Sequence, residues 1–441
     1  MRLRPAYAAV AGAFLLNGLI FGTLAARLPA LQSGLGLTDG ELALALVALN
    51  GGALVGLQAG AMLTRRFGTR ATLRVALPTF ALLLMPIAAA PTLPALAAAL
   101  AGSAAVNSVV DVAVNANGLT VERRYGHPVL SRLHAMLTLG GIIGAGIAAG
   151  VATLGAGVHT HFATVATIGI GGAVLLPRWL ATESPRPLSP RRRVDGAGSL
   201  PNPPRVGPRR RSRAGRLLGL GGLACCVTLA EGSGNDWTAV YLHGLGASEA
   251  FAASGVATFL GAMTAGRFAG DHLRDRIDAV PLVRGAALVA AVGLGLALLI
   301  RHPVAGLTGF GLLGLGLSIT LPVILAVASQ RAAQDGVPPA VTIARVSAMA
   351  YLGSFVGPGL IGALATTTSL GTALFLPVAV AATAALAAEV LAPRVSSPMN
   401  LFQPPLAVRR GRRWKSGRMR RAVQVEKGSI QRKTARRPRE R

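Results

Sequence analysis

The feature that most constrains the fold is an internal repeat of fifteen residues. Arg132–Gly146 and Arg345–Gly359 agree at seven of their fifteen aligned positions, and the two arginines are 213 residues apart. Each copy lies in a long apolar segment. A fixed register between an arginine and several glycines in two such segments indicates two copies of one membrane helix. The repeat therefore predicts two related halves, each a bundle of membrane-spanning helices.

Composition agrees with this prediction. Hydrophobic residues make up 52% of the chain and charged residues 14%, whereas soluble domains carry about 25% charged residues. A helix that crosses ~30 Å of hydrocarbon needs about 20 apolar residues. The sequence predicts twelve such spans, at 6–28, 42–63, 73–90, 94–117, 133–154, 161–180, 216–242, 250–270, 280–300, 304–328, 341–365 and 370–391. The predicted fold class is an all-α membrane protein of two pseudo-symmetric six-helix bundles.

Four parts follow along the chain. We expect an N-terminal bundle at 1–180, a basic flexible cytoplasmic linker at 181–215, a C-terminal bundle at 216–393, and a basic disordered tail at 394–441. Linker and tail supply most of the net charge of +28. We interpret the tail as a solvated segment that helps to set topology. Contact with anionic lipids of the inner leaflet is the main alternative, and nucleic-acid binding is not expected.

The distribution of basic residues predicts the topology. If the N-terminus is cytoplasmic, the basic clusters at 65–74, 123–132 and 267–276 lie on the same side as the linker and the tail. The opposite side holds only Arg301, together with Arg27 near the outer end of the first span. Cytoplasmic loops of membrane proteins carry the excess of Lys and Arg. We therefore expect both termini in the cytoplasm.

Motifs typical of enzymes and metal sites are absent from the sequence. The only cysteines, Cys225 and Cys226, are adjacent within one predicted span. We find no metal-ligand spacing, no Gly-rich phosphate loop and no nucleophile–base pairing. We therefore expect no enzymatic activity, no metal and no cofactor.

Ionisable and amide side chains inside the spans are the candidate functional residues of the N-terminal half. Such groups are costly in a membrane and usually line a watery path. Asn107, Asp111 and Asn115 are spaced four residues apart and share one helix face. A structural hydrogen bond between helices is the alternative role. His134 begins the next span, where it either relays protons with Asp111 or forms a local hydrogen bond.

The C-terminal half carries its polar residues in the seventh span. Glu231 lies near the middle of the predicted membrane, and the repeat makes Asn17 of the first span its counterpart. Paired helices of related halves bind substrate at this depth, so Glu231, with Asn235 nearby, is our strongest candidate for substrate or proton binding. Trp237 either stacks on a sugar face or anchors the helix at the membrane interface.

Two opposite charges predict a gate. Arg27 and Asp236 lie toward the outer ends of the first and seventh spans, which the repeat makes equivalent. We expect an ion pair that closes the outer side; separate contact of each side chain with the surface is the alternative.

The chain resembles the Major Facilitator Superfamily over about 1–391. Twelve spans in two sets of six, a long central loop and a basic Gly-containing loop at 61–70 carry the resemblance, although Arg65 stands where the family has an aspartate. The corresponding loop at 266–276 keeps its acidic residues. The resemblance implies that Arg267 and Asp271 take part in gating.

Finer features resemble a bacterial branch of that superfamily, the YbjJ type near the fucose:proton symporters. They are Phe21–Pro29, Asp111–Asn115, Glu122-Arg123, Ser131–His134 and Glu231–Trp237. The resemblance implies a monomeric transporter of the bacterial cytoplasmic (inner) membrane. We expect it to move a small polar solute, sugar or sugar-acid-like, by alternating access and coupled to protons. A drug or metabolite exporter of the same fold, and a membrane sensor or scaffold, are the alternatives.

Overall fold

The predicted apolar segments form α-helices in the computed structural model, which describes residues 3–125, 129–180, 208–274, 276–335, 337 and 339–392. Within these ranges the chain forms helices and no strand. Most of the expected linker and the region after 392 lie outside the described residues. Helix α9 begins at Pro208, before the expected end of the linker at 215.

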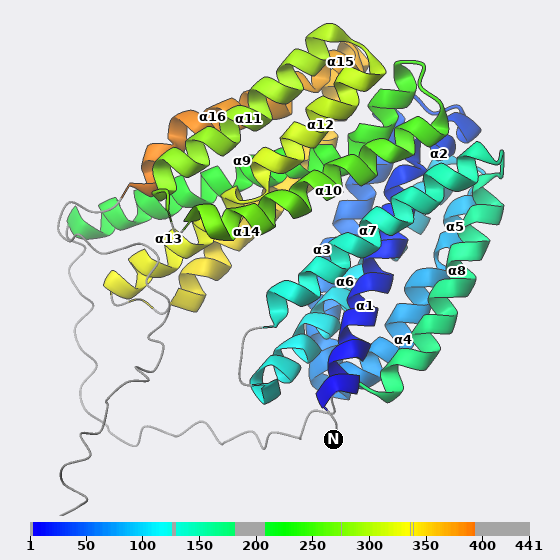
Figure 1. Cartoon of the computed structure of the whole chain (residues 1–441), viewed down its shortest axis with the longest axis horizontal. Helices are drawn as coiled ribbons and strands as arrows, with labels where there is room; N and C mark the ends of the chain where they lie inside the picture. Colours follow the sequence, from blue (N-terminus) through cyan, green and yellow to red (C-terminus); the bar gives the residue numbers. More distant parts are fainter. Residues whose placement is uncertain are drawn as a thin grey trace, which may run out of the picture. The chain divides into compact units, whose positions relative to one another are not determined.

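The N-terminal half consists of eight α-helices and one 3-10 turn in the described ranges (Figure 1). They are α1 (Leu3–Ala26), α2 (Leu28–Leu35), α3 (Asp39–Phe67), α4 (Thr69–Leu82), α5 (Leu84–Ala88), α6 (Leu93–Tyr125), α7 (Leu130–Thr153), α8 (Val158–Leu175) and η1 (Leu176–Arg178). Together α4 and α5 form the predicted third span.

The C-terminal half also forms eight α-helices and one 3-10 turn in the described ranges, but here the tenth and twelfth predicted spans, rather than the third, are divided. Its elements are α9 (Pro208–Gly244), α10 (Glu249–Arg274), α11 (Ala279–Ile300), α12 (Pro303–Leu317), α13 (Thr320–Gln334), α14 (Pro339–Thr367), α15 (Leu370–Ala373), α16 (Phe375–Leu386) and η2 (Ala387–Leu391). All twelve predicted spans therefore coincide with helices, and the predicted all-α architecture is confirmed.

Eleven segments of the described chain are long and apolar enough to cross a membrane. The predicted span at 250–270 is not among them, although it forms the 26-residue helix α10. The polar residues Ser254, Thr258 and Thr264, together with Arg267, lower its hydropathy. Because α10 packs against α7, α9 and α12, protein neighbours cover much of its surface, so it needs less apolar surface than a lipid-exposed span.

The repeat has a packing function. A side chain at Gly140 would clash with the backbone oxygen of Leu15 on α1, and a side chain at the equivalent Gly353 would clash with that of Cys225 on α9. Helices α1 and α7, and likewise α9 and α14, therefore approach backbone to backbone. Small residues permit such close packing in membranes, which explains why both copies keep these glycines.

The two halves meet along the bundle from its middle to one of its ends. We call that end the far end; it holds the end of α1 and the start of α3, whereas the start of α1 lies at the near end. A side chain at Gly40 of α3 would meet Thr366 of α14, and one at Gly362 would meet Ala43. Near the middle, Gly141 of α7 packs against Leu260 of α10.

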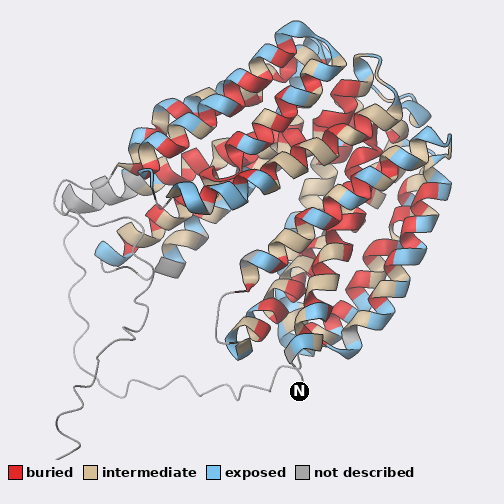
Figure 2. Cartoon of the chain, in the orientation of Figure 1, coloured by how far each residue is buried: buried red, intermediate tan, exposed pale blue. Residues whose placement is uncertain are grey.

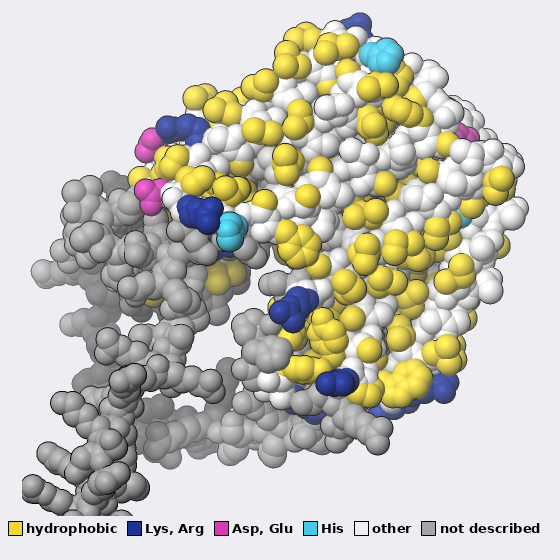
Figure 3. All heavy atoms as spheres, in the orientation of Figure 1, with side chains coloured by type: hydrophobic (Ala, Val, Ile, Leu, Met, Phe, Trp, Pro, Cys, Tyr) yellow, Lys and Arg dark blue, Asp and Glu magenta, His cyan; other side chains and the backbone are white. Residues whose placement is uncertain are grey.

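The helix surfaces fit a lipid environment. Buried residues lie on the helix faces that pack against other helices (Figure 2). Large apolar side chains such as Leu44, Val55 and Val75 are 63%, 67% and 69% exposed. Figure 3 shows one face that is largely hydrophobic, with Lys and Arg toward the ends of the helices. Hydrocarbon can cover such extensive apolar surface, and the chain is a multi-pass membrane protein.

Candidate functional site

A carboxylate and an amide from two helices form the polar centre of the N-terminal half. Asn17 of α1 donates a hydrogen bond from Nδ2 to Oδ1 of Asp111 on α6, at 2.7 Å. Asn17 is 2% exposed, and its own Oδ1 is buried without a partner among the described residues. The contact joins two residues that were predicted separately and leaves one buried acceptor open.

The other two amides on the α6 stripe have different surroundings. Asn115 donates from Nδ2 to the backbone oxygen of Asp111, at 2.9 Å, which is a contact within its own helix. Asn107 has a buried Oδ1 with no hydrogen-bond partner in the described part of the chain. Of the three residues, Asp111 therefore forms the hydrogen bond to another helix, and Asn107 keeps a free acceptor.

The C-terminal half holds a carboxylate paired with a cation. Arg267 of α10 approaches Oε1 of Glu231 on α9 to 3.4 Å, and the two side chains are 44% and 23% exposed. Asn235 donates from Nδ2 to the backbone oxygen of Glu231, at 3.1 Å. The predicted substrate residue Glu231 and the predicted gating residue Arg267 thus belong to one cluster.

Tyr351 of α14 is a site residue that the sequence analysis missed. It is 51% exposed, and its hydroxyl lies within electrostatic range of the Asp111 carboxylate. Phe355, one turn further on, packs toward Gly51 of α3. Tyr351 occupies the position of Thr138 in the other copy of the repeat. This exchange of a threonine for a tyrosine was the available signal.

These groups lie at similar depth. Asp111 is eighteen residues from the far end of α6, Arg267 eighteen from that of α10, and Tyr351 sixteen from that of α14. Glu231 is thirteen residues from the end of α9. At about 1.5 Å per residue, all four lie roughly 20–27 Å from the far end. Helices of both halves therefore present polar groups near the middle of the bundle.

The far end carries a third polar cluster. Arg27, in the turn between α1 and α2, donates from one guanidinium nitrogen to Oε2 of Glu249 at 2.6 Å, and from the other to the backbone oxygen of Ala156 at 2.8 Å. The Arg27 side chain is 2% exposed and that of Glu249 is 42% exposed. Since Glu249 begins α10, this ion pair joins the two halves.

The predicted pair of Arg27 with Asp236 is wrong. Asp236 lies eight residues inside the end of α9, or about 12 Å below it, whereas Arg27 lies just past the end of α1. The two charges therefore differ in depth, and the start of α10 offers Glu249 at the level of Arg27. Asp236 is partly buried and has no ion-pair partner among the described residues.

Three other predicted residues have local or undefined roles. His134 uses Nδ1 in a hydrogen bond with the oxygen of Leu130 in its own helix, at 3.0 Å, which corresponds to the local alternative. Trp237 is fully buried, so the interpretation as an interfacial anchor is wrong. The side chain of Asp271 lies outside what the structure describes.

No cluster of three or more His, Cys, Asp or Glu side chains that could hold a metal occurs among the described residues. The two polar clusters near the middle of the bundle, together with Tyr351, provide carboxylates, amides, one phenol and one guanidinium. Groups of this kind bind solutes through hydrogen bonds and can hold protons.

Comparisons with known proteins agree with this architecture. The sequence model of the Major Facilitator Superfamily matches residues 10–341. An uncharacterised transporter of Sinorhizobium fredii, y4wD, is 33% identical over 394 residues, covering 88% of this chain and 99% of its own. An uncharacterised MFS-type transporter of Yersinia pestis is 30% identical over 363 residues, covering 82% and 89%.

Solved structures share the fold at low sequence identity. The nucleoside transporter NupG superposes with a TM-score of 0.65 at 13% identity, covering 89% of this chain and 99% of its own. A point variant of the E. coli fucose:proton symporter FucP gives a TM-score of 0.56 at 17% identity, with 88% and 98% covered.

Proposed function

Because this chain belongs to the Major Facilitator Superfamily of membrane transporters, we propose that it moves a small polar solute across the bacterial cytoplasmic membrane together with protons. The solute binds between the two halves, at the depth of Asp111 and Glu231. The protein works as a monomer by alternating access. The relation to a fucose:proton symporter of the same fold supports this proposal.

The arrangement of the halves supports an inward-facing state. With the basic loops on the cytoplasmic side, the near end is cytoplasmic and the far end is outside. The halves contact each other at the far end, through Gly40 and Thr366 and through the Arg27–Glu249 ion pair. Access of solute from the outside then requires that these contacts open while the near ends close.

The Asp111–Asn17 pair carries the proposal of proton coupling. Asn17 already donates to Oδ1 of Asp111, and its own buried Oδ1 lacks a donor among the described residues. When Asp111 is protonated, its hydroxyl can donate to that oxygen while the amide keeps donating in return. An acid and an amide are matched in this cyclic arrangement. The site can therefore hold Asp111 in both protonation states without a change of partner.

The charges around the site favour one class of solute. The Asp111 carboxylate accepts a hydrogen bond from the neutral amide of Asn17, and Glu231 is already opposed by Arg267. A sugar acid would bring a further negative charge close to Asp111, whereas a neutral sugar offers hydroxyl groups to carboxylate, amide and guanidinium. The half-exposed ring of Tyr351 provides an apolar face for a sugar ring. We therefore propose a neutral polyhydroxylated solute, such as a sugar, over a sugar acid.

Transport by proteoliposomes tests the proposal. The purified chain would be reconstituted with a pH-sensitive dye inside, and neutral sugars, sugar acids and nucleosides would be added outside in turn. We expect proton flux with a neutral sugar and accumulation of that sugar when a proton gradient is imposed. Asp111→Asn should abolish accumulation but keep counterflow exchange within about threefold, because the amide retains hydrogen bonds but carries no proton.

A matched variant separates coupling from general damage. Asp278→Asn makes the same chemical change at an exposed residue outside the site, and we expect it to behave like the parent. Accumulation by Asp111→Asn equal to that of the parent would contradict the coupling role. Solute leaving loaded vesicles in exchange for protons would identify the exporter alternative. Absence of flux with every solute class would favour a sensor or scaffold.

A further inference from the structure

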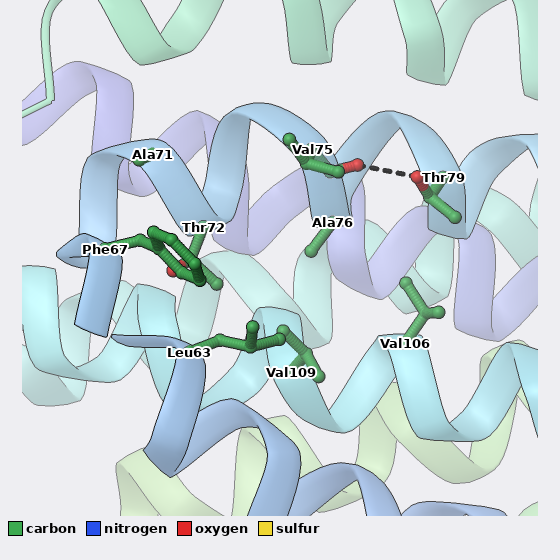
Figure 4. Close-up of a pocket in the computed structure, with 9 residues that line it drawn as sticks. All are labelled: Leu63, Phe67, Ala71, Thr72, Val75, Ala76, Thr79, Val106 and Val109. Atoms are coloured by element: carbon green, nitrogen blue, oxygen red, sulfur yellow. Dashed lines mark hydrogen bonds between the residues drawn. The ribbon is translucent and has the colours of Figure 1, made fainter. Parts of the chain in front are cut away.

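A groove on the outside of the N-terminal half is separate from the transport site. It has a volume of about 440 Å³ and lies between α3, α4 and α6 (Figure 4). It is lined by Leu63, Phe67, Ala71, Thr72, Val75, Ala76, Thr79, Val106 and Val109. On α6, Val109 is two residues from Asp111, and such residues point in nearly opposite directions. The groove is therefore on the other side of α6 from the polar centre.

The groove offers no free hydrogen-bonding side chain. Its only polar lining residues are Thr72 and Thr79, and each donates its hydroxyl to a backbone oxygen of the preceding turn, at 2.9 Å to Gly68 and 2.7 Å to Val75. Figure 4 shows the second of these bonds, which keeps the Thr79 hydroxyl on its own helix. The occupant of this groove must therefore be apolar along its length.

The groove is open to the surface that faces hydrocarbon. Val75 is 69% exposed and Phe67 56% exposed, although both line it. Along α4 it runs from Ala71 to Thr79, or about 12 Å at the helical rise. One leaflet of hydrocarbon is about 15 Å thick, half of the ~30 Å core. The groove thus has the length and polarity that suit one acyl chain in the leaflet at the near end.

Its near end is strongly basic. The Arg66 guanidinium lies 5.2 Å from the centroid of the Phe67 ring, which itself lines the groove. Arg66 and Arg74 are exposed and have no acidic partner among the described residues. From 42 to 110 the chain contains no Asp or Glu at all. Positive charge at the mouth of the groove is therefore unbalanced.

We propose that this groove binds a glycerophospholipid with an anionic headgroup. One acyl chain fills the space between α3, α4 and α6. The phosphate lies at the mouth beside Arg66 and Arg74. A zwitterionic lipid has the same acyl chain but no net negative charge to balance the positive charge of the arginines. The site therefore prefers the anionic lipid.

Lipid retained by the purified protein tests the proposal. The full chain would be purified in detergent, mixed with equal amounts of palmitoyl-oleoyl phosphatidylglycerol and phosphatidylcholine, and analysed by native mass spectrometry. We expect the parent to retain phosphatidylglycerol at least about threefold over phosphatidylcholine. Ala71→Phe, which fills the groove from an exposed position, and the double variant Arg66→Gln with Arg74→Gln should each abolish this preference.

Matched controls separate the groove from general effects. Ala61→Phe adds the same ring at an exposed position on α3 outside the groove, and Arg132→Gln with Arg345→Gln removes two exposed arginines elsewhere. Both should retain lipid like the parent. Ala71→Met would replace Ala71→Phe if gel filtration showed that the phenylalanine variant does not fold.

Three results would overturn the proposal. Loss of preference in the arginine variant but not in Ala71→Phe would mean binding by headgroup charge alone. Equal retention of both lipids by the parent would mean a groove without selectivity for charge. Unchanged preference in both variants would place the retained lipid elsewhere on the protein.

Discussion

Helix α10 takes part in two ion pairs whose surroundings differ. At its far end, Glu249 meets Arg27 at 2.6 Å and joins the two halves. Eighteen residues later, Arg267 meets Glu231 at 3.4 Å within the C-terminal half. Arg27 is 2% exposed and Arg267 is 44% exposed. One helix therefore connects the contact that closes the far end with a group of the proposed solute site.

The difference in burial assigns different tasks to the two pairs. A buried guanidinium that loses its partner remains as an uncompensated charge, so the Arg27 pair is strongly coupled to closure. A partly exposed pair gains little from its mutual attraction and can exchange partners with water or a solute. We infer that the first pair determines the conformational equilibrium and that the second is free to bind solute.

Removal of Arg27 should have the largest effect. Loss of one partner of a buried ion pair costs about 3–5 kcal/mol, and we expect about 3 kcal/mol here because Glu249 is 42% exposed. This would shift the equilibrium about a hundredfold toward opening of the far end. Ala43, which packs against Gly362 at the contact between the halves, provides the probe. In a background without Cys225 and Cys226, Ala43→Cys should react much faster with a membrane-impermeant thiol reagent when Arg27 is alanine.

Controls distinguish loss of the Arg27–Glu249 contact between the halves from damage to the fold. Leu154 is 83% exposed in the parent, so Leu154→Cys should react equally with and without Arg27. Exchange of the charges, Arg27→Glu with Glu249→Arg, should restore slow labelling of Ala43→Cys in part. Asp236→Asn should leave labelling unchanged. Equal labelling of Ala43→Cys with and without Arg27 would show that the ion pair does not hold the halves together.

Glu231→Gln should have an intermediate effect, on solute binding rather than on closure. A charge-assisted hydrogen bond to the solute contributes about 1.5–3 kcal/mol, so the half-saturation concentration should rise at least about tenfold. Since the pair with Arg267 is partly exposed, thermal stability should change by no more than about 3 °C. Counterflow exchange as a function of solute concentration measures the first effect, and a melting curve in detergent measures the second.

The contrast with Asp111→Asn sharpens this prediction. Glu231→Gln should weaken accumulation and exchange together, whereas Asp111→Asn should remove accumulation alone. An unchanged half-saturation concentration in Glu231→Gln would place the solute away from α9. Loss of accumulation alone in both variants would mean that the two carboxylates share the proton and that Glu231 has no separate role in solute binding.

The sequence predicted much of this fold because its signals are local or periodic. Apolar length marked the twelve helices, and the repeat paired Gly140 with Gly353, which the structure explains by close packing on α1 and α9. Carboxylates within apolar segments could also be identified from the sequence. Asp111 and Glu231 were identified as polar groups inside spans, and both lie at the middle depth of the bundle.

Partners were harder to predict because they depend on the rotation and axial shift of separate helices. Arg27 was assigned to Asp236 by repeat symmetry, yet a depth difference of about 12 Å excludes that pair and Glu249 takes its place. Glu249 lies outside every predicted span and so attracted no attention. Tyr351 was missed because an aromatic residue in an apolar segment is usually interpreted as a residue that packs in the core.

The smallest effect should come from a third ion pair, which tests whether burial or distance determines the ranking. Arg284 and Glu389 are 2.6 Å apart, as close as Arg27 and Glu249, but their side chains are 44% and 66% exposed. Exposed pairs contribute about 0–1 kcal/mol, so Arg284→Gln and Glu389→Gln should each change transport and thiol labelling by less than about twofold. Arg284 also donates to the backbone oxygen of Ala385 at 3.4 Å, so Glu389→Gln is the cleaner of the two variants. If Glu389→Gln altered Ala43→Cys labelling as strongly as Arg27→Ala did, short distance rather than burial would determine the effect, and the far-end pair would lose its special role.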